Sequence, residues 1–415
     1  MATAQGGDDA GLKESLKPMK TLNICHLGKY YPPASGGIET HVRTLAGAQA
    51  ALGANVRVFC VNHQAGPTVV EDDGPVEVTR FGRLGSALKL DFCPELFKSI
   101  RNVEADILHL QVPNPTMILA VLAARPRQPL VVTYQSDVVV QKLRALVFRP
   151  LERLAYRKVR KIMPSSPVYP GGSEFLRAYT GLIQVLPMGI DLEPYLHPSA
   201  ENLERAQVIR REHSRGGPIW LCAGRLVYYK GFVNAIRALK SVEGRLLIVG
   251  DGPGEAELRD EANRLGLAGR VEFLGALPYL DIIPYYRAAD AFWFPSNARS
   301  EAFGLVQVEA MASDCPVINT EIPHSGVPWV SQNGDTGLTV PINDPDALAA
   351  AAKRLLNEPG LRDRLVTAAR RRAITEFDHK VMAERSLDIY QAVLESDRRY
   401  IEDTPRTLLL KSQAP

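Results

Sequence analysis

The stretch AFWFPSNARSEAFGLVQVEAMA, residues 291–312, contains the pattern that decides the fold. Its first four residues are apolar or aromatic, as in a fully buried β-strand, and Pro295 and Ser296 end that run. A polar loop follows, and residues 305–312 then form an apolar helical segment. A buried strand joined by a loop to a helix is the unit from which parallel sheets with helices on both faces are built.

The same unit recurs in both halves of the chain. In the first half, apolar runs predict strands at residues 22–27, 56–61, 76–81, 106–110, 130–134 and 161–164. In the second half, they predict strands at residues 219–223, 246–249, 271–274, 291–294, 316–319 and 337–340. The sequence therefore predicts an α/β protein of two Rossmann-like domains that face each other across a cleft, where such sheets bind ligands. Fold alone does not identify the ligand.

The chain has 415 residues, which is too long for one ordinary domain. The predicted parts are a disordered tail at 1–18, a first domain at 19–195, a linker at 196–217, a second domain at 218–375, a helix crossing back to the first domain at 376–397 and a polar tail at 398–415. The linker is polar and is expected to contain a short helix. The crossing helix is predicted because its amphipathic pattern is followed by no further strand.

The composition is that of a globular protein, with 46% apolar and 23% charged residues. The net charge of +3 gives no whole-chain signal for binding nucleic acid. No apolar run approaches the ~18 residues of a spanning helix, and the first residues lack the apolar core of a signal peptide. The five cysteines are scattered, which argues against a disulfide scaffold or a zinc site. We therefore expect a cytoplasmic protein.

Two glycine-rich loops follow predicted strands. Gly36 and Gly37 precede a helix whose first N–H groups can bind a phosphate, and glycine lets the backbone approach that ligand closely. Gly250 and Gly252 lie in the sequence GDGPG, which also follows a strand. Neither loop has the G-x-G-x-x-G pattern of dinucleotide sites, and a plain turn is the alternative explanation for each.

A pair of cations lies in the loop GRLVYYKG, residues 224–231, between a strand and a helix. Arg225 offers a bidentate fork and Lys230 a point charge, and together they match a diphosphate. The alternative is a pair of solvated surface charges. The flanking glycines and the position at the carboxyl end of a strand favour the functional interpretation.

The opening stretch also contains two carboxylates, Glu301 in the loop and Glu309 in the helix. At ~1.5 Å rise per residue they are expected to lie roughly 10 Å apart, which could span from a hexose to a ribose. Carboxylates only accept hydrogen bonds and therefore suit sugar hydroxyls. Between them, the N–H groups of Phe303, Gly304 and Leu305 lie at a helix N-terminus and can face a leaving phosphate. The alternative is two ordinary helix glutamates.

Taken in order, these motifs resemble those of the family 4 retaining glycosyltransferases with the GT-B fold. The resemblance covers about residues 21–395 and depends most on the Glu301-x7-Glu309 element. It implies an acceptor-binding first domain and a nucleotide-sugar-binding second domain. In this family the residue matching Glu309 holds the ribose, the one matching Glu301 contacts the donor sugar, and those matching Arg225 and Lys230 hold the diphosphate. The first glycine loop approaches the phosphates and the acceptor.

Two departures from the family pattern concern the first domain. Family members often have His-x-His after the fourth strand, where this chain has His109-Leu-Gln111. Many have Thr-x-His-x-Asp after the next strand, where this chain has Thr-Tyr-Gln135-Ser-Asp137. His109 is a candidate catalytic residue, and a satisfied strand-end histidine is the equal alternative. The candidate acceptor-side residues are His41, Gln111, Gln135 and Asp137.

The segment 141–162 carries eight cations and only one acid. The predicted membrane-docking residues are Lys142, Arg144, Arg149, Arg153, Arg157, Lys158, Arg160 and Lys161. Apolar residues between them predict an amphipathic helix that Pro150 kinks or divides, and a basic amphipathic helix is typical of membrane-surface binding. The alternative is the solvated face of a core helix. Nucleic acid is disfavoured because aromatics are sparse and no matching motif is present.

These observations lead to a hypothesis of hexose transfer with retained configuration, from a nucleotide diphosphate sugar to a hydroxyl of a lipid-linked glycan in cell-surface polysaccharide synthesis. The overall resemblance favours GDP-mannose as donor, and UDP-glucose or UDP-N-acetylglucosamine is the alternative. No cofactor and no metal are expected, because the loop cations can stabilise the leaving diphosphate. The rival functions are a GT-B-like epimerase or phosphorylase and a non-catalytic nucleotide-sugar-binding subunit. Docking is expected at the inner membrane face.

Overall fold

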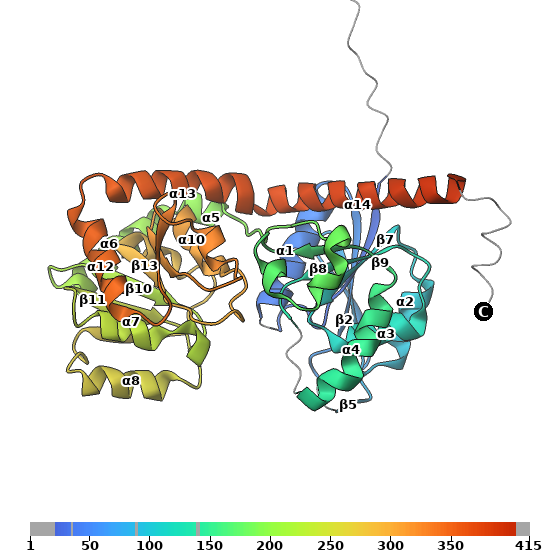
Figure 1. Cartoon of the computed structure of the whole chain (residues 1–415), viewed down its shortest axis with the longest axis horizontal. Helices are drawn as coiled ribbons and strands as arrows, with labels where there is room; N and C mark the ends of the chain where they lie inside the picture. The colour runs from blue at the N-terminus through green and yellow to red at the C-terminus, as the bar shows by residue number, and fades with distance from the viewer. Residues whose placement is uncertain (1–20, 35, 88–89, 138–141, 404–415) are drawn as a thin grey trace, which may run out of the picture.

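The computed structural model describes residues 21–34, 36–87, 90–137 and 142–403, with the backbone alone at 87, 142–147 and 400–403. The predicted tail at residues 1–18 and the last part of the predicted tail at 398–415 lie outside the described residues. Two α/β domains lie side by side, and a pair of long helices runs along both of them (Figure 1). The predicted architecture is therefore confirmed.

The first domain is built on a seven-stranded sheet in the order β3-β4-β2-β1-β7-β8-β9. Its strands are β1 Asn23–Leu27, β2 Asn55–Val61, β3 Val69–Asp73, β4 Val76–Phe81, β7 Ile107–Val112, β8 Leu130–Tyr134 and β9 Val159–Pro164, with a separate hairpin of β5 Gly85–Ala87 and β6 Leu90–Phe92. All neighbours are parallel except β3, which pairs antiparallel with β4 at the edge. Its helices are α1 Gly37–Ala51, α2 Pro94–Asn102, α3 Pro115–Ala124 and α4 Lys142–Tyr156, with short 3-10 turns η1 Tyr169–Gly172 and η2 Leu176–Leu182.

The second domain is built on a six-stranded parallel sheet in the order β12-β11-β10-β13-β14-β15. Its strands are β10 Ile219–Ala223, β11 Arg245–Val249, β12 Val271–Gly275, β13 Ala291–Phe294, β14 Val317–Thr320 and β15 Gly337–Val340. Its helices are α5 Glu193–Leu196, α6 Ala200–Ser214, α7 Phe232–Ala238, α8 Glu255–Arg264, α9 Ile283–Ala288, α10 Leu305–Ala312, α11 Val327–Val330, α12 Pro345–Asn357 and α13 Leu361–Phe377, with a 3-10 turn η3 Tyr228–Lys230.

Both sheets have the strand order of a doubly wound Rossmann fold, in which the direction of winding reverses at the middle of the sheet. In the second domain the reversal lies between β10 and β13, which are paired through Trp220–Ala291 and Leu221–Phe292. The central strands are apolar on both faces, because helices cover both faces. In that core the rings of Trp220 and Trp293 stack with their centroids 4.9 Å apart. The loops after β10 and β13 therefore emerge side by side.

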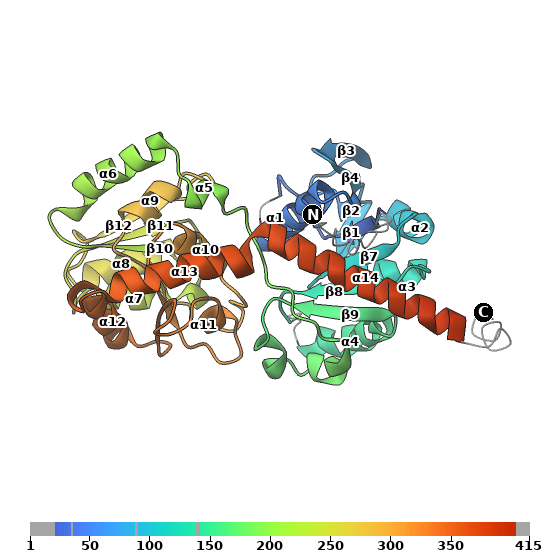
Figure 2. The same cartoon turned by 90° about the horizontal axis from the view of Figure 1, so that it is seen from above.

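The chain passes between the domains at two points that touch each other. Helix α14, His379–Asp403, continues from α13 and lies on the first domain (Figures 1 and 2). The Ile190 amide donates to the Phe377 carbonyl at 3.0 Å, and the His379 amide donates to the Ile190 carbonyl at 2.9 Å. Gly189 packs directly on the Asp378 backbone, where a Cβ would lie 2.8 Å from the carbonyl oxygen. Both connections therefore share one joint.

Two segments differ in detail from the sequence prediction. Residues 196–217, predicted as a linker with a short helix, contain the 15-residue helix α6, which buries Ala206 and Ile209. The basic segment is not one helix: α4 ends at Tyr156, and Arg160 and Lys161 lie on β9. The reason is that this stretch pairs with β8, with one register shift after Val159, and buries Val159, Ile162 and Met163 in the sheet. Helix α4 runs through Pro150 without dividing.

Candidate active site

The loop after β10 is shaped by glycines in left-handed or extended conformations. Gly224 has φ 138° and Gly231 has φ 67°, backbone angles that residues with a side chain rarely adopt. The second glycine loop packs against this one, because the Leu226 amide donates to the Asp251 carbonyl at 2.7 Å and a Cβ on Gly252 would lie 2.6 Å from the Leu226 carbonyl. In this structure Gly250 and Gly252 therefore support the backbone of the cation loop.

The loops after β10 and β13 meet as their strand positions require. The Asn297 amide donates to the Tyr229 carbonyl at 2.8 Å, and Lys230 Nζ lies 2.5 Å from Glu301 Oε2. Both side chains of this ion pair are 12% exposed, and the ammonium lies 5.1 Å from the centroid of the Phe294 ring. Arg225 is exposed, and its side chain has no hydrogen bond or ion pair within the described ranges. Lys230 and Glu301, predicted from the sequence, are therefore in contact.

The second carboxylate, Glu309, lies on α10 and is 8% exposed. The Tyr286 hydroxyl donates to Glu309 Oε2 at 3.0 Å. Burial raises the pKa of Glu309 to about 7, and the Tyr286 hydrogen bond and the Lys230 charge oppose that rise. Lys230 thus acts electrostatically on both predicted carboxylates. Tyr286 could not be predicted from the sequence, because a tyrosine inside an apolar helix has no motif of its own.

The start of α10 is organised by Gly304, which has φ 79° and packs against the Phe294 ring. Phe303 is buried, and the Gln307 side chain donates to its carbonyl at 3.1 Å. Within the described residues, the amides of Phe303, Gly304 and Leu305 donate to no backbone or side-chain acceptor. Three donors beside the Lys230–Glu301 pair give this corner the positive potential that favours an anion.

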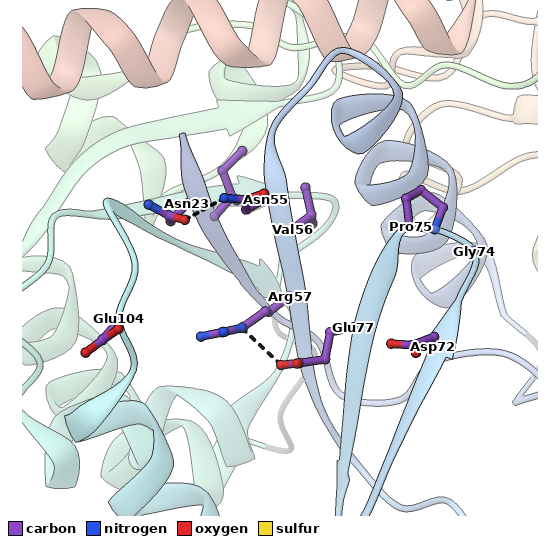
Figure 3. Close-up of a pocket in the computed structure, with 10 residues that line it drawn as sticks. Asn23, Asn55, Val56, Arg57, Asp72, Gly74, Pro75, Glu77 and Glu104 are labelled. Atoms are coloured by element: carbon purple, nitrogen blue, oxygen red, sulfur yellow. Dashed lines mark hydrogen bonds and ion pairs between the residues drawn. The ribbon is translucent and has the colours of Figure 1, made fainter. Parts of the chain in front are cut away.

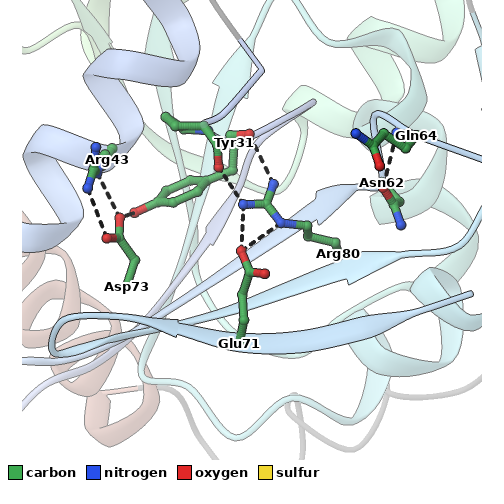
Figure 4. Close-up of polar contacts among 8 residues, drawn as sticks. Tyr31, Arg43, Asn62, Gln64, Glu71, Asp73 and Arg80 are labelled. Atoms are coloured by element: carbon green, nitrogen blue, oxygen red, sulfur yellow. Dashed lines mark hydrogen bonds and ion pairs between the residues drawn. The ribbon is translucent and has the colours of Figure 1, made fainter. Parts of the chain in front are cut away.

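In the first domain, Gly36 and Gly37 are exposed at the start of α1, and Ser35 between them and β1 lies outside the described residues. The loop that leads to them is anchored by Arg80 from β4, which donates to the Tyr31 carbonyl at 3.0 Å and pairs with Glu71 at 2.6 Å (Figure 4). Tyr31 in turn donates to Asp73, which also binds Arg43 (Figure 4). This network holds the backbone of the segment that leads to Gly36 and Gly37.

The predicted acceptor-side residues divide into two groups. His41 and His109 are fully buried, and burial lowers the pKa of both rings, that of His41 to about 4. His109 bonds Thr133 through Nε2 at 2.6 Å and Tyr390 through Nδ1 at 2.6 Å. This placement matches the structural alternative for His109. Gln111 and Gln135 are also buried, whereas Asp137 is half-buried and pairs with Arg299 of the second domain.

One pocket lies within the first domain and another between the two domains. The pocket drawn in Figure 3, of about 410 Å³, lies where β1, β2 and β4 begin and contains the Arg57–Glu77 ion pair; no predicted site residue lines it. A pocket of about 600 Å³ lies between the domains, lined by Thr40 and Thr44 of α1 and by Tyr279 of the second domain. The described residues contain no group of three or more His, Cys, Asp or Glu side chains that could hold a metal ion.

Comparisons with known proteins cover both domains. Residues 36–183 match the family described as a glycosyl transferase 4-like domain, and residues 205–372 match the glycosyl transferases group 1. The O-antigen chain mannosyltransferase C of Escherichia coli is 31% identical over 90% of this chain and 100% of its own length. The D-rhamnosyltransferase WbpZ of Pseudomonas aeruginosa is 32% identical over 81% of this chain and 87% of its own.

The solved structures agree on the arrangement of the domains. The sucrose-phosphate synthase of Thermosynechococcus elongatus superposes with a TM-score of 0.71 at 24% sequence identity, covering 90% of this chain and 100% of the synthase. The likeness extends over both domains and shows the GT-B fold, and both sheets here have the doubly wound strand order of Rossmann-like domains. From the match of both halves to these families and the full-length likeness to transferases, we conclude that the chain belongs to the group 1 glycosyltransferases.

Proposed function

We propose that the protein transfers a hexose, with retention of configuration, from a nucleotide diphosphate sugar to a hydroxyl of a glycan acceptor. The observation that carries this proposal is the Lys230–Glu301 ion pair, which lies at the switch point of the second sheet with Glu309 within range of the same ammonium. Cations for a diphosphate and acceptors for sugar hydroxyls are thus next to each other.

In the proposed mechanism, the diphosphate takes the place of Glu301 as the partner of Lys230, and exposed Arg225 closes on it from the same loop. Glu301 is then free to accept hydrogen bonds from the donor sugar, and Glu309 accepts those of the ribose. The bond from the anomeric carbon to the diphosphate oxygen breaks, and its electron pair stays on the diphosphate. The acceptor oxygen attacks from the same face and gives its proton to that oxygen, so no cofactor or metal enters.

We further propose GDP-mannose as the donor and a lipid-linked glycan as the acceptor. The relatives that support this are named as an O-antigen chain mannosyltransferase and, at 30% identity over 87% of this chain, the phosphatidyl-myo-inositol mannosyltransferase of Mycobacterium leprae. A UDP-glucose or UDP-N-acetylglucosamine donor is the alternative. Among the described residues, no helix has the length and apolarity to span a membrane.

We propose peripheral docking through α4 on the inner face of the membrane. Arg149, Arg153, Arg157 and Lys158 are exposed, and Leu151 and Leu154 are 36% and 47% exposed between them. Exposed leucines among cations suit an anionic lipid surface. The side chains of Lys142 and Arg144 lie outside the described residues, and Arg160 and Lys161 belong to β9, where Arg160 pairs with Asp397 at 2.9 Å.

The test begins with a thermal-shift screen of GDP-mannose, UDP-glucose and UDP-N-acetylglucosamine, because a ligand that binds the native state raises its melting temperature. Free nucleotide is then measured with and without a lipid-linked glycan. We expect nucleotide release only when the acceptor is present. Release of free sugar phosphate would identify a phosphorylase, interconversion of the donor an epimerase, and donor binding without transfer a non-catalytic subunit.

A further inference from the structure

The loop that carries Glu301 also binds the first domain, through a residue that no motif singled out. Arg299 donates from Nη1 to Asp137 Oδ2 at 2.5 Å and from Nη2 to the Tyr169 carbonyl at 3.0 Å. Its guanidinium lies 4.1 Å from the centroid of the Tyr169 ring, and its Nε donates to the His324 carbonyl at 3.3 Å. Two of these three hydrogen bonds and the ring contact cross from one domain to the other.

Asp137 is held in place to receive this cation. The Tyr134 hydroxyl donates to Oδ1 at 2.8 Å and the Ser173 hydroxyl at 2.5 Å, while the Tyr169 hydroxyl lies 3.4 Å from Oδ2. Burial by itself raises the pKa of Asp137, but the hydrogen bonds from Ser173, Tyr134 and Arg299 outweigh burial and lower it. The carboxylate is therefore ionised in this arrangement, and the Tyr134 and Ser173 hydroxyls of the first domain hold it in place.

Close backbone contacts surround the Arg299–Asp137 pair. A Cβ on Gly172 of the first domain would lie 2.5 Å from the Cβ of His324 in the second domain. A Cβ on Gly326 of the second domain would lie 3.0 Å from the Cβ of Ser166 in the first domain. Each contact needs a glycine. The interface is therefore a close-fitting contact, in contrast to exposed ion pairs between long mobile side chains, which contribute little.

The loop of Glu301 is held on both sides, by the first domain before Glu301 and by contacts inside the second domain at and after it. Arg299 precedes Glu301 by two residues, and the Ala302 carbonyl that follows it accepts the Gly326 amide at 2.8 Å. The Glu301 carbonyl accepts the Ser325 hydroxyl at 2.5 Å. Moving the first domain away from Arg299 therefore removes the first-domain contacts before Glu301, whereas the contacts of the loop with Ser325 and Gly326 remain.

We propose that Arg299 is a positioning residue, which uses Asp137 and Tyr169 to set the Glu301 loop only when the two domains are closed. This inference rests on the proposed function for the role of Glu301, and it adds the coupling between domain closure and that role. Donor binding uses side chains of the second domain and does not need the pair. Transfer needs the closed arrangement, since small misplacements of a catalytic group are costly.

The test combines kinetics with hydrogen exchange on the full-length protein. We expect Arg299→Ala to lower kcat by about a hundredfold while changing the Kd for GDP-mannose, measured calorimetrically without acceptor, by less than about threefold. Arg299→Lys keeps the charge but loses the planar fork and is expected to recover kcat to within about tenfold of the wild type. Asp137→Asn should lower kcat less when it is added to Arg299→Ala than when it is made in the wild type, because both changes remove the same contact.

Hydrogen exchange supplies a measurement that does not depend on transfer. In Arg299→Ala, amides of residues 166–173 and of residues 295–304 are both expected to exchange about tenfold faster, although they belong to different domains. The matched control is Arg210→Ala, which breaks a two-bond pair with Asp290, at 3.0 Å for each bond, inside the second domain. That control should leave both segments and kcat as in the wild type.

Each outcome decides the inference. Unchanged hydrogen exchange at residues 166–173 in Arg299→Ala overturns the inference. If kcat falls while that exchange stays unchanged, Arg299 acts on the substrate directly and does not couple the domains. If Arg299→Ala fails to fold, the same comparison is made with Arg299→Lys. A wild-type protein that transfers no sugar would defeat the proposed function, whereas the exchange measurement would still decide whether Arg299 couples the domains.

Discussion

Lys230 is the residue on which the proposed chemistry depends most. Its ammonium is nine-tenths covered and already paired with Glu301, so it is preorganised to stabilise charge on a leaving diphosphate. We expect Lys230→Ala to lower kcat/KM by about 10²–10³-fold with the circular dichroism spectrum unchanged. The matched control is Lys240→Ala, an exposed lysine of the same domain. Activity of Lys230→Ala within about threefold of the control would contradict the assigned role.

Glu309 links the site to the pH dependence of stability. Its pKa is raised from 4.5 to about 7, so between these values the native state holds a proton that the unfolded chain has released. The free energy of unfolding therefore falls as pH rises through that window, by up to roughly 3 kcal/mol. We expect Glu309→Gln to be more stable than the wild type at pH 8 and about equal at pH 5, measured by urea unfolding.

Glu257→Gln, an exposed glutamate on α8, is the control for this measurement and should follow the wild type at both pH values. Glu309→Gln should also weaken donor binding, because the carboxylate proposed to accept hydrogen bonds from the ribose is lost. A variant that gains stability and loses affinity together is expected where a buried charge is kept for function. Equal stability of Glu309→Gln and wild type at pH 8 would contradict the raised pKa.

At the scale of elements, helix α14 is attached to the first domain by a buried hydrogen-bond network. The Tyr390 hydroxyl bonds His109 Nδ1 at 2.6 Å, and the Gln49 amide donates to Tyr390 at 3.1 Å and to Ser386 at 2.7 Å. We expect Tyr390→Phe to lower the free energy of unfolding by about 1–3 kcal/mol, because it leaves buried partners unsatisfied. Tyr228→Phe, at a side chain 84% exposed, is the control and should cost nothing measurable.

Elements with apolar side chains on both faces could be predicted closely from the sequence. The predicted strands at 130–134, 219–223 and 291–294 coincide with β8, β10 and β13. Their signal is strong because a central parallel strand is buried on both sides. The cation and carboxylate motifs followed from the same strands, since the carboxyl ends of β10 and β13 place Lys230 beside Glu301.

Elements whose partners lie far away in the sequence could not be predicted. Strand β3, Val69–Asp73, is acidic and exposed, and it forms because it pairs with β4. Helix α3, Pro115–Ala124, has too few polar residues to show helical periodicity. Arg299 and Asp137 are separated by 162 positions, so only the folded arrangement reveals the pair.

At the scale of the whole molecule, the first domain carries the surface proposed to meet the membrane. We expect binding to vesicles that contain phosphatidylglycerol, weaker binding to vesicles of phosphatidylcholine alone, and release at high salt, because the attraction is electrostatic. Replacing Arg153 and Arg157 of the basic segment by serine should weaken binding about tenfold or more, at about 1 kcal/mol per cation. Sedimentation with the vesicles measures it.

The control for the vesicle experiment replaces Arg211 and Arg371, exposed cations of the second domain, by serine. This variant has the same net charge as the double variant on the first domain. An equal loss of binding in both would indicate attraction by net charge alone and would contradict docking through α4.

The tie between Ile190 and Asp378 has a mechanical consequence. The two chain segments that join the domains are hydrogen-bonded to each other. One domain can therefore rotate relative to the other but has little freedom to slide past it. Such a rotation separates the two domains least near the tie between Ile190 and Asp378 and most at the side far from it. Opening at the rim far from the tie therefore leaves the axis on which the domains turn undisturbed.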